Sequence, residues 1–159
     1  MIYLDQAATS FPKIKEVQDA VIDCMNRCTN ANRSTSTTSL NASRLIYQTR
    51  KLVKEYFHVP QEGCVVLNSG NTESLNTCIK GIVKKGDHVI TTYAEHNSVL
   101  RPLYQLEKAN IITLSITSPT VEDIKKHLQK KTKMIIVTHS SNVTGEIYLI
   151  AEIGKLAHE

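Results

Sequence analysis

The sequence predicts an α/β fold with a mostly parallel sheet flanked by helices, and three observations support this. Short runs of continuously apolar residues alternate with longer segments in which apolar residues recur every three or four positions. Strands that are apolar along their whole length are typical of parallel sheets, because helices cover both faces of such sheets. The chain has 159 residues, of which 41% are hydrophobic and 21% charged, as expected of a globular protein with one sizeable core.

The first third of the chain is predicted to be mainly helical. A short strand at 2–4 comes before a turn, and helical spacing of apolar residues predicts a first helix around 17–28. A loop rich in Asn, Ser and Thr is expected at 29–39. A second helix, around 45–56, ends before Pro60, since the residue before a proline disfavours the helical conformation.

From residue 64 onwards, strands and helices are predicted to alternate. The expected strands are 64–67, 88–92, 111–116 and 134–138, and the expected helices lie around 75–83, 98–108, 121–128 and 150–158. Thr120 and Asp123 resemble a capping box, in which a hydroxyl and an acid three residues later satisfy the first N–H groups of a helix.

Composition argues against several functional classes. The net charge is only +4, and two Phe, six Tyr and no Trp leave few rings for base stacking, so we expect no nucleic-acid binding. No segment is apolar enough to cross a bilayer. Met1 is followed directly by Ile2, with no basic and then apolar leader, which predicts a cytoplasmic protein without membrane contact.

The cysteines do not form a recognisable metal site. Cys24 and Cys28 are four residues apart on a predicted helix, a spacing that places two ligands on one face, but no further Cys or His pair completes a zinc site. We therefore expect no metal, and we interpret these two residues, Cys64 and Cys78 as reduced cysteines buried in the core.

Three loops follow predicted strands at the edge where parallel sheets bind ligands, namely 68–72, 93–97 and 139–145. In the first, free N–H groups at a helix start, Gly70 and the Thr72 hydroxyl suit a phosphate, although a Thr–Glu helix cap without a ligand is the more common explanation of such a sequence. In the second, His96 is either a ring that stacks on a ligand or carries a proton, or, as is more common, a surface residue or a loop residue with its own hydrogen bonds. The third is either a polar binding loop or a simple turn.

Five stretches in these regions together resemble one known family. They are IYLDQAATS from Ile2, LNSGNTESLN from Leu67, GDHVITT from Gly86, EHNSVLRPL from Glu95 and THSSNVTG from Thr138. In this order and spacing the chain resembles class V aminotransferases of the fold-type-I pyridoxal-phosphate enzymes, particularly cysteine desulfurases and selenocysteine lyases. The resemblance implies that residues 1–159 are the N-terminal part of the large, cofactor-binding domain of such an enzyme.

The resemblance also implies roles for individual residues. Asn71 and Thr72 match the turn that holds the phosphate of pyridoxal 5'-phosphate, and His96 matches the histidine that stacks on its ring. Asn142 matches an asparagine near the phenolic oxygen of the ring, while Ala7 and Ala8 match a loop on the substrate side. The implied reaction removes sulfur or selenium from cysteine or selenocysteine, with a cysteine nucleophile accepting the sulfur. The implied partners are a cysteine-like amino acid and a second copy of the chain.

Some residues depart from the family pattern. The stretch 30–36 retains Arg33 but lacks the glycines and the histidine found in relatives, and Gln6 replaces an asparagine. No lysine or cysteine of this chain matches the Schiff-base lysine or the catalytic cysteine, both of which are expected beyond Glu159. The chain is therefore expected to be inactive alone. The alternatives are a non-catalytic binding or interaction module, or a class V relative acting on another amino acid.

The predicted sheet leads to a first testable prediction. Without the strands and helices that follow in the family, an open sheet edge and an uncovered apolar face would remain. We therefore expect the isolated chain to self-associate or to be only marginally stable. Light scattering over a dilution series measures this, and a stable monomer at low concentration would contradict it.

Overall fold

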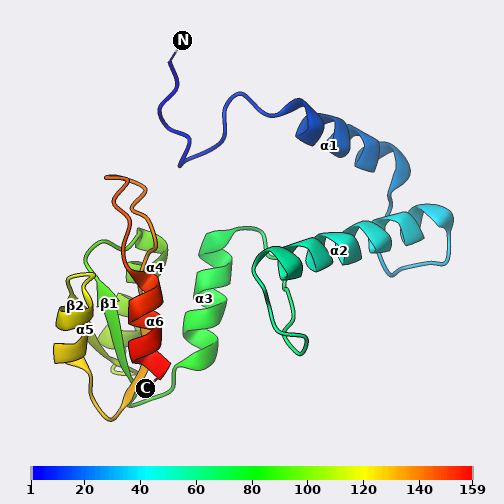
Figure 1. Ribbon diagram of the computed structural model, residues 1–159. Helices are drawn as coiled ribbons and strands as arrows, with labels where there is room; N and C mark the ends of the chain where they lie inside the picture. Colours follow the sequence, from blue (N-terminus) through cyan, green and yellow to red (C-terminus); the bar gives the residue numbers. More distant parts are fainter. Residues whose placement is uncertain (1, 159) are drawn as a thin grey trace. The chain divides into compact units, whose positions relative to one another are not determined.

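The computed structural model describes residues 2–158, and the chain forms two compact units, Met1–Leu67 and Asn68–Glu159 (Figure 1). Each unit is described by itself below. The prediction that all 159 residues belong to one larger domain stays a prediction.

The first unit consists of two helices and their connecting loops. Helix α1 spans Lys15–Arg27 and helix α2 spans Thr37–Tyr56, which confirms both predicted helices. Helix α2 begins earlier than expected because the Ser36 hydroxyl caps it, accepting a hydrogen bond from the Ser39 backbone N–H at 3.4 Å.

The two strands predicted for the first unit are wrong. Residues 2–4 and 64–67 are apolar runs, but neither is a strand in the described structure. A strand exists only when its N–H and C=O groups pair with a neighbouring strand, and neither segment has such a neighbour among residues 2–158. An apolar run in the sequence is therefore not enough to predict a strand.

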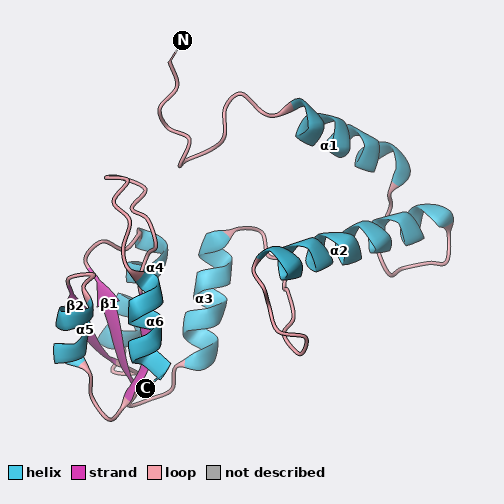
Figure 2. Ribbon diagram, in the orientation of Figure 1, coloured by secondary structure: helices cyan, strands magenta, loops and turns pink. Residues whose placement is uncertain are grey.

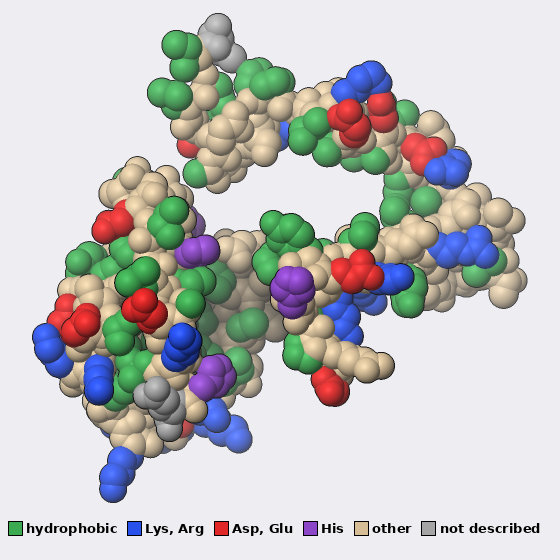
Figure 3. Space-filling model, in the orientation of Figure 1, with side chains coloured by type: hydrophobic (Ala, Val, Ile, Leu, Met, Phe, Trp, Pro, Cys, Tyr) green, Lys and Arg blue, Asp and Glu red, His purple; other side chains and the backbone are tan. Residues whose placement is uncertain are grey.

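Apolar side chains of the first unit are largely exposed. Helix α1 has no buried residue, and Val21 and Met25 on it are 55% and 78% exposed. On α2, Leu52 and Tyr56 are also exposed, and hydrophobic side chains appear on the surface over both helices (Figure 3). In α2 only Ser39 and Ala42 are buried.

The second unit alternates helices and strands along the chain (Figure 2). Its elements are α3 Asn71–Ile82, β1 His88–Thr92, α4 Asn97–Lys108, β2 Thr113–Thr117, α5 Val121–His127, β3 Thr132–Ile136 and α6 Ile150–His158. Strand β1 has the predicted bounds, whereas β2 and β3 are each displaced by up to two residues.

The three strands form a parallel sheet in the order β2-β1-β3. Strand β1 lies in the middle, with Val89 opposite Leu114 on one side and Met134 on the other. All five β1 residues are buried, as expected for a strand covered on both faces. The predicted fold class, a parallel sheet flanked by helices, is confirmed.

Alternate residues of β1 point into two separate hydrophobic clusters. Val89 packs with Ile79 of α3 and with Val99 and Leu103 of α4. On the opposite face, Ile90 packs with Ile124 of α5 and Ile153 of α6. Helices α3 and α4 therefore cover one face of the sheet and α5 and α6 the other.

Helix α5 begins with the cap that the sequence predicted. The Thr120 hydroxyl accepts a hydrogen bond from the Asp123 backbone N–H at 3.2 Å and donates one to the Asp123 carboxylate at 2.9 Å. Within residues 2–158, no helix combines the length and apolar character needed to span a membrane.

His88, at the start of β1, joins all three strands. Its Nδ1 lies 2.8 Å from the Thr132 hydroxyl of β3 and its Nε2 lies 2.9 Å from the Ser115 hydroxyl of β2. The residue is 1% exposed, so burial lowers its pKa, and the nearby charges of Lys131 and His127 lower it further.

Burial of His88 makes stability depend on pH. Because its pKa in the folded protein lies below the unfolded value near 6.5, unfolded chains bind the proton first as the pH falls. The contribution of neutral His88 is complete above about pH 6.5 and is lost as the pH falls towards the folded-state pKa. We expect wild type to lose more stability than His88→Gln between pH 7 and pH 5 in urea unfolding.

A matched control is His158→Gln, at an exposed position near the end of α6. It should keep the wild-type pH dependence. Equal slopes in wild type and His88→Gln would contradict the assignment. Independently of pH, His88→Leu should cost about 2 kcal/mol, since it removes the hydrogen bonds of the imidazole to the Ser115 and Thr132 hydroxyls.

Candidate functional site

Two cavities of the second unit share His96 and its neighbour Asn97. The first, called here the Thr72 cavity, has a volume of about 320 Å³ and lies between α3 and α4. The second, the Asn142 cavity, has a volume of about 550 Å³ and is lined by the loop after β1 and the segment 141–148. The structure therefore brings Thr72 and His96 to one cavity, and His96 and Asn142 to its neighbour.

The start of α3 offers free hydrogen-bond donors. Its N-cap is Gly70, which has no side chain to satisfy the first turn, and the first bond to the helix is from the Ser74 N–H to the Gly70 carbonyl. Within the described residues, the backbone N–H groups at 71–73 have no acceptor. Such a helix end attracts anions.

Glu73, in the first turn of α3, is already held by its own loop. Its Oε2 accepts hydrogen bonds from the Ser69 N–H at 2.8 Å and from the Ser69 hydroxyl at 2.6 Å. These bonds lower the pKa of the Glu73 carboxyl. The carboxylate fixes the loop that leads into α3.

The lining of the Thr72 cavity is electropositive. Lys80 of α3 and Arg101 of α4 both line it, together with the amides of Asn76 and Gln105, and no Asp or Glu contributes to the lining. Neither cation was predicted from the sequence as a site residue. For Lys80 the available signal was its spacing, since positions 72, 76 and 80 share one face of a helix.

His96 is fixed in place by capping α4. Its Nδ1 accepts a hydrogen bond from the Ser98 backbone N–H at 3.1 Å and lies 2.8 Å from the Ser98 hydroxyl. A ring nitrogen that accepts from an N–H carries no proton, so we assign the proton of the neutral ring to Nε2. The outward nitrogen of the ring is therefore a donor.

Asn142 lies in a hairpin that follows β3. Residues 140 and 147 form an antiparallel bridge, and the Ser141 N–H donates to the Glu146 carbonyl at 2.9 Å. The Ser141 hydroxyl accepts from the N–H groups of Val143 and Thr144, each at 3.2 Å, and Gly145 closes the turn with a φ of 73°. The exposed Asn142 side chain thus sits on a well-defined turn.

Glu95 is a buried residue to which the sequence alone assigned no role. It is 9% exposed, and its Oε1 accepts hydrogen bonds from the Thr92 hydroxyl at 2.9 Å and the Thr138 N–H at 2.6 Å. Burial raises the pKa of its carboxyl, and the two hydrogen bonds oppose that shift.

The remaining predicted site residues are placed as follows. Asn71 is the first residue of α3 but does not line either cavity. Ala7 and Ala8 belong to the first unit, where they line a cavity of about 560 Å³ together with Lys13 and Val17. The roles expected for these three residues stay predictions.

The interpretation of all four cysteines as core residues is wrong. Cys64 and Cys78 are exposed, and Cys24 and Cys28 are only partly buried. Apolar character alone had suggested burial. All four are free, and among residues 2–158 no group of three potential metal ligands is close enough to bind a metal ion.

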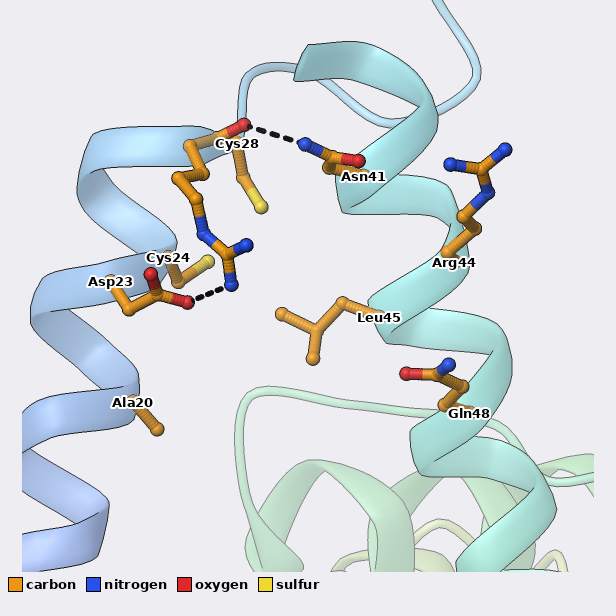
Figure 4. A pocket seen from close by; sticks show the side chains of 9 residues that line it. Ala20, Asp23, Cys24, Cys28, Asn41, Arg44, Leu45 and Gln48 are labelled. Carbon is orange, nitrogen blue, oxygen red and sulfur yellow. Dashed lines mark hydrogen bonds and ion pairs between the residues drawn. The ribbon is translucent and has the colours of Figure 1, made fainter. Parts of the chain in front are cut away.

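Cys24 and Cys28 line a cavity of about 270 Å³ between α1 and α2 (Figure 4). Leu45 and Asn41 of α2 lie across from them, and the Asn41 amide donates to the Arg27 carbonyl at 3.5 Å. Burial and the neighbouring Cys24 thiol raise the pKa of Cys28, which keeps the thiol protonated and poorly nucleophilic.

Comparison with known proteins adds independent information. The sequence model of the family "Aminotransferase class-V" matches residues 2–159. A probable cysteine desulfurase of Borreliella burgdorferi is 32% identical over 170 residues, covering 99% of this chain and 40% of the relative. The cysteine desulfurase IscS of Dictyoglomus turgidum is also 32% identical, with 99% and 42% covered.

A solved structure shows the same fold. The apo cysteine desulfurase of Thermococcus onnurineus NA1 superposes with a TM-score of 0.80 at 28% sequence identity, over 99% of this chain and 41% of that one. The chain thus spans about 40% of the length of the relatives it matches. With a match along its whole described length, this chain belongs to the aminotransferase class-V family.

Proposed function

We propose that this chain supplies the phosphate-binding and ring-binding part of a pyridoxal 5'-phosphate site in a cysteine desulfurase-like enzyme. The observation that carries the proposal is that His96 is shared by the cavity of Thr72 and the cavity of Asn142. Three of the four residues matched to the cofactor on sequence thus line these two adjoining cavities, although they are separated by up to 70 positions in the chain, whereas Asn71 lines neither.

The Thr72 cavity fits the phosphate group. The free N–H groups at the start of α3 and the Thr72 hydroxyl are neutral donors, and Lys80 and Arg101 add positive charge to the same lining. Phosphate is favoured by such a helix end together with cationic side chains. No carboxylate in the lining opposes it.

His96 and Asn142 fit the cofactor ring. The imidazole is held by Ser98, and His96 is exposed and lines the cavity, so its ring can serve as a flat stacking surface, while the Asn142 amide can donate to an oxygen on the cofactor ring. When bound, pyridoxal phosphate supplies an electron sink for carbanion chemistry on amino acids. The residues of this chain bind and orient it.

The finer points of function are part of the same proposal. The substrate is a cysteine-like amino acid, carrying sulfur or selenium. The substrate-side role of Ala7 and Ala8 rests on the family resemblance alone. The working form is a homo-oligomer in the cytoplasm. Since no lysine or cysteine of this chain matches the family's catalytic ones, we expect cofactor binding without turnover from residues 1–159 alone.

The proposal predicts that Thr72→Val weakens the binding of pyridoxal phosphate. Loss of a hydrogen bond to a charged group costs about 1.5 kcal/mol or more, so the dissociation constant should rise about tenfold. Titration followed by cofactor absorbance and fluorescence measures this. Thr77→Val is the matched control, because Thr77 is exposed on the same helix and lies outside the cavity.

Other outcomes separate the alternatives. Equal affinities of wild type and Thr72→Val would place the phosphate elsewhere. Absence of any binding by wild type would favour the non-catalytic module. Borohydride reduction followed by peptide mass spectrometry tests for a covalent bond, and a stoichiometric adduct on one lysine would overturn the expectation that the chain lacks the attaching residue.

A further inference from the structure

We propose that Glu95 is a positioning residue that fixes the loop carrying His96 relative to the hairpin carrying Asn142. The inference concerns the geometry of the second unit, and its consequence for cofactor binding rests on the proposed function. No sequence match assigned a role to this carboxylate.

The position of Glu95 relative to the sheet is the first argument. Pairing between β1 and β3 ends at Thr91 and Ile136, so backbone hydrogen bonds of the sheet no longer join the segments that follow these two strands. Within the described residues, the bond from the Thr138 N–H to the Glu95 carboxylate is the hydrogen bond that connects them past this end. The Glu95 side chain thus connects the two segments where backbone pairing has ended.

The geometry of the contact is the second argument. One oxygen, Oε1, accepts both from Thr138 at 2.6 Å and from the Thr92 hydroxyl at 2.9 Å. Bonds from neutral donors to a carboxylate are shorter and stronger than those between neutral groups. With the side chain 9% exposed, water competes poorly for these donors.

The neighbours of Glu95 in sequence are the third argument. His96 follows it directly and caps α4, so holding Glu95 also restricts the backbone that carries the imidazole. Thr138 lies two residues before the bridge at 140 and 147 that closes the Asn142 hairpin. Glu95 itself lines the cavity between them. One carboxylate therefore holds two ligand-facing segments.

Alternative uses of Glu95 fit the contacts less well. The two protein donors on Oε1 account for the position of the carboxylate without any role in proton transfer. As part of a structural ion pair it would need a cation, and none of the ion pairs among residues 2–158 includes it. The contacts are those of a brace between two loops.

The experiment compares hydrogen exchange of the full chain in wild type, Glu95→Ala, Glu95→Gln and the control Glu107→Ala. Glu107 is exposed on α4 and lies outside both cavities. In Glu95→Ala the Thr138 amide loses its acceptor, so peptides covering 93–97 and 137–142 should exchange about tenfold faster. Peptides from β1 and β2 should keep wild-type protection. Glu95→Gln retains an acceptor oxygen and should restore slow exchange.

Cofactor affinity gives a second readout. Glu95→Ala should bind pyridoxal phosphate about tenfold more weakly, and Glu95→Gln should recover most of the affinity. If wild type binds no cofactor, the proposed function fails, and the exchange measurement still decides whether Glu95 positions the loops.

Three results would overturn the inference. Unchanged exchange at 137–142 in Glu95→Ala would show that the contact between Glu95 and Thr138 does not stabilise this segment. Faster exchange throughout the second unit would show general destabilisation instead of local positioning. Failure of Glu95→Gln to restore protection would also contradict it. Should Glu95→Ala not fold, Glu95→Asp replaces it, since the side chain is one methylene shorter and withdraws from Thr138 without emptying the site.

Discussion

The burial of β1 on both faces and along both edges is the constraint on which the second unit depends. Parallel strands flank it on either side, and α3 with α4 and α5 with α6 cover its two faces. Every polar backbone and side-chain group of this strand must therefore find a hydrogen-bond partner inside the protein. His88 at its beginning and Glu95 just after its end are polar residues that this environment accommodates because hydroxyl or amide groups hydrogen-bond both ring nitrogens of His88 and Oε1 of Glu95.

The same constraint explains why the site forms where it does. Since β1 and β3 run in the same direction, their carboxyl ends meet at one edge of the sheet, and the segments that leave them carry His96 and Asn142. Packing of Ile79 against Leu103 and Val99 brings α3 next to α4, which in turn places Thr72 beside the His96 cap. Apolar contacts thus position the polar side chains of the candidate site.

Much of this could be predicted from the sequence, and the failures have a common cause. The strand His88–Thr92 could be predicted because residues 89–92 are all β-branched and favour an extended chain, and the Thr120 cap could be predicted because it is local. The runs at 2–4 and 64–67 also predict strands, but strand formation needs a partner, which no local pattern reveals. Exposure of Cys64 and Cys78 was missed for the same reason, since burial depends on what packs against a residue.

The residues of the candidate site divide in a similar way. Thr72, His96 and Asn142 were matched to the cofactor by family motifs, and their roles stay predictions. The placement of Lys80, Arg101 and Glu95 depends on helix packing or on a contact between residues 43 positions apart, which no local pattern reveals.

The His96 cap has a consequence for the cost of binding. An exposed imidazole normally samples several rotamers, and a ligand that stacks on it must select one and pay the lost side-chain entropy. Here the Ser98 N–H already holds the ring through Nδ1 before any ligand arrives. The orientation of the imidazole is therefore set during folding, by the same hydrogen bond that caps α4. A planar ligand then binds to a ring that is already oriented. Affinity for such a ligand then depends on the stability of a helix end.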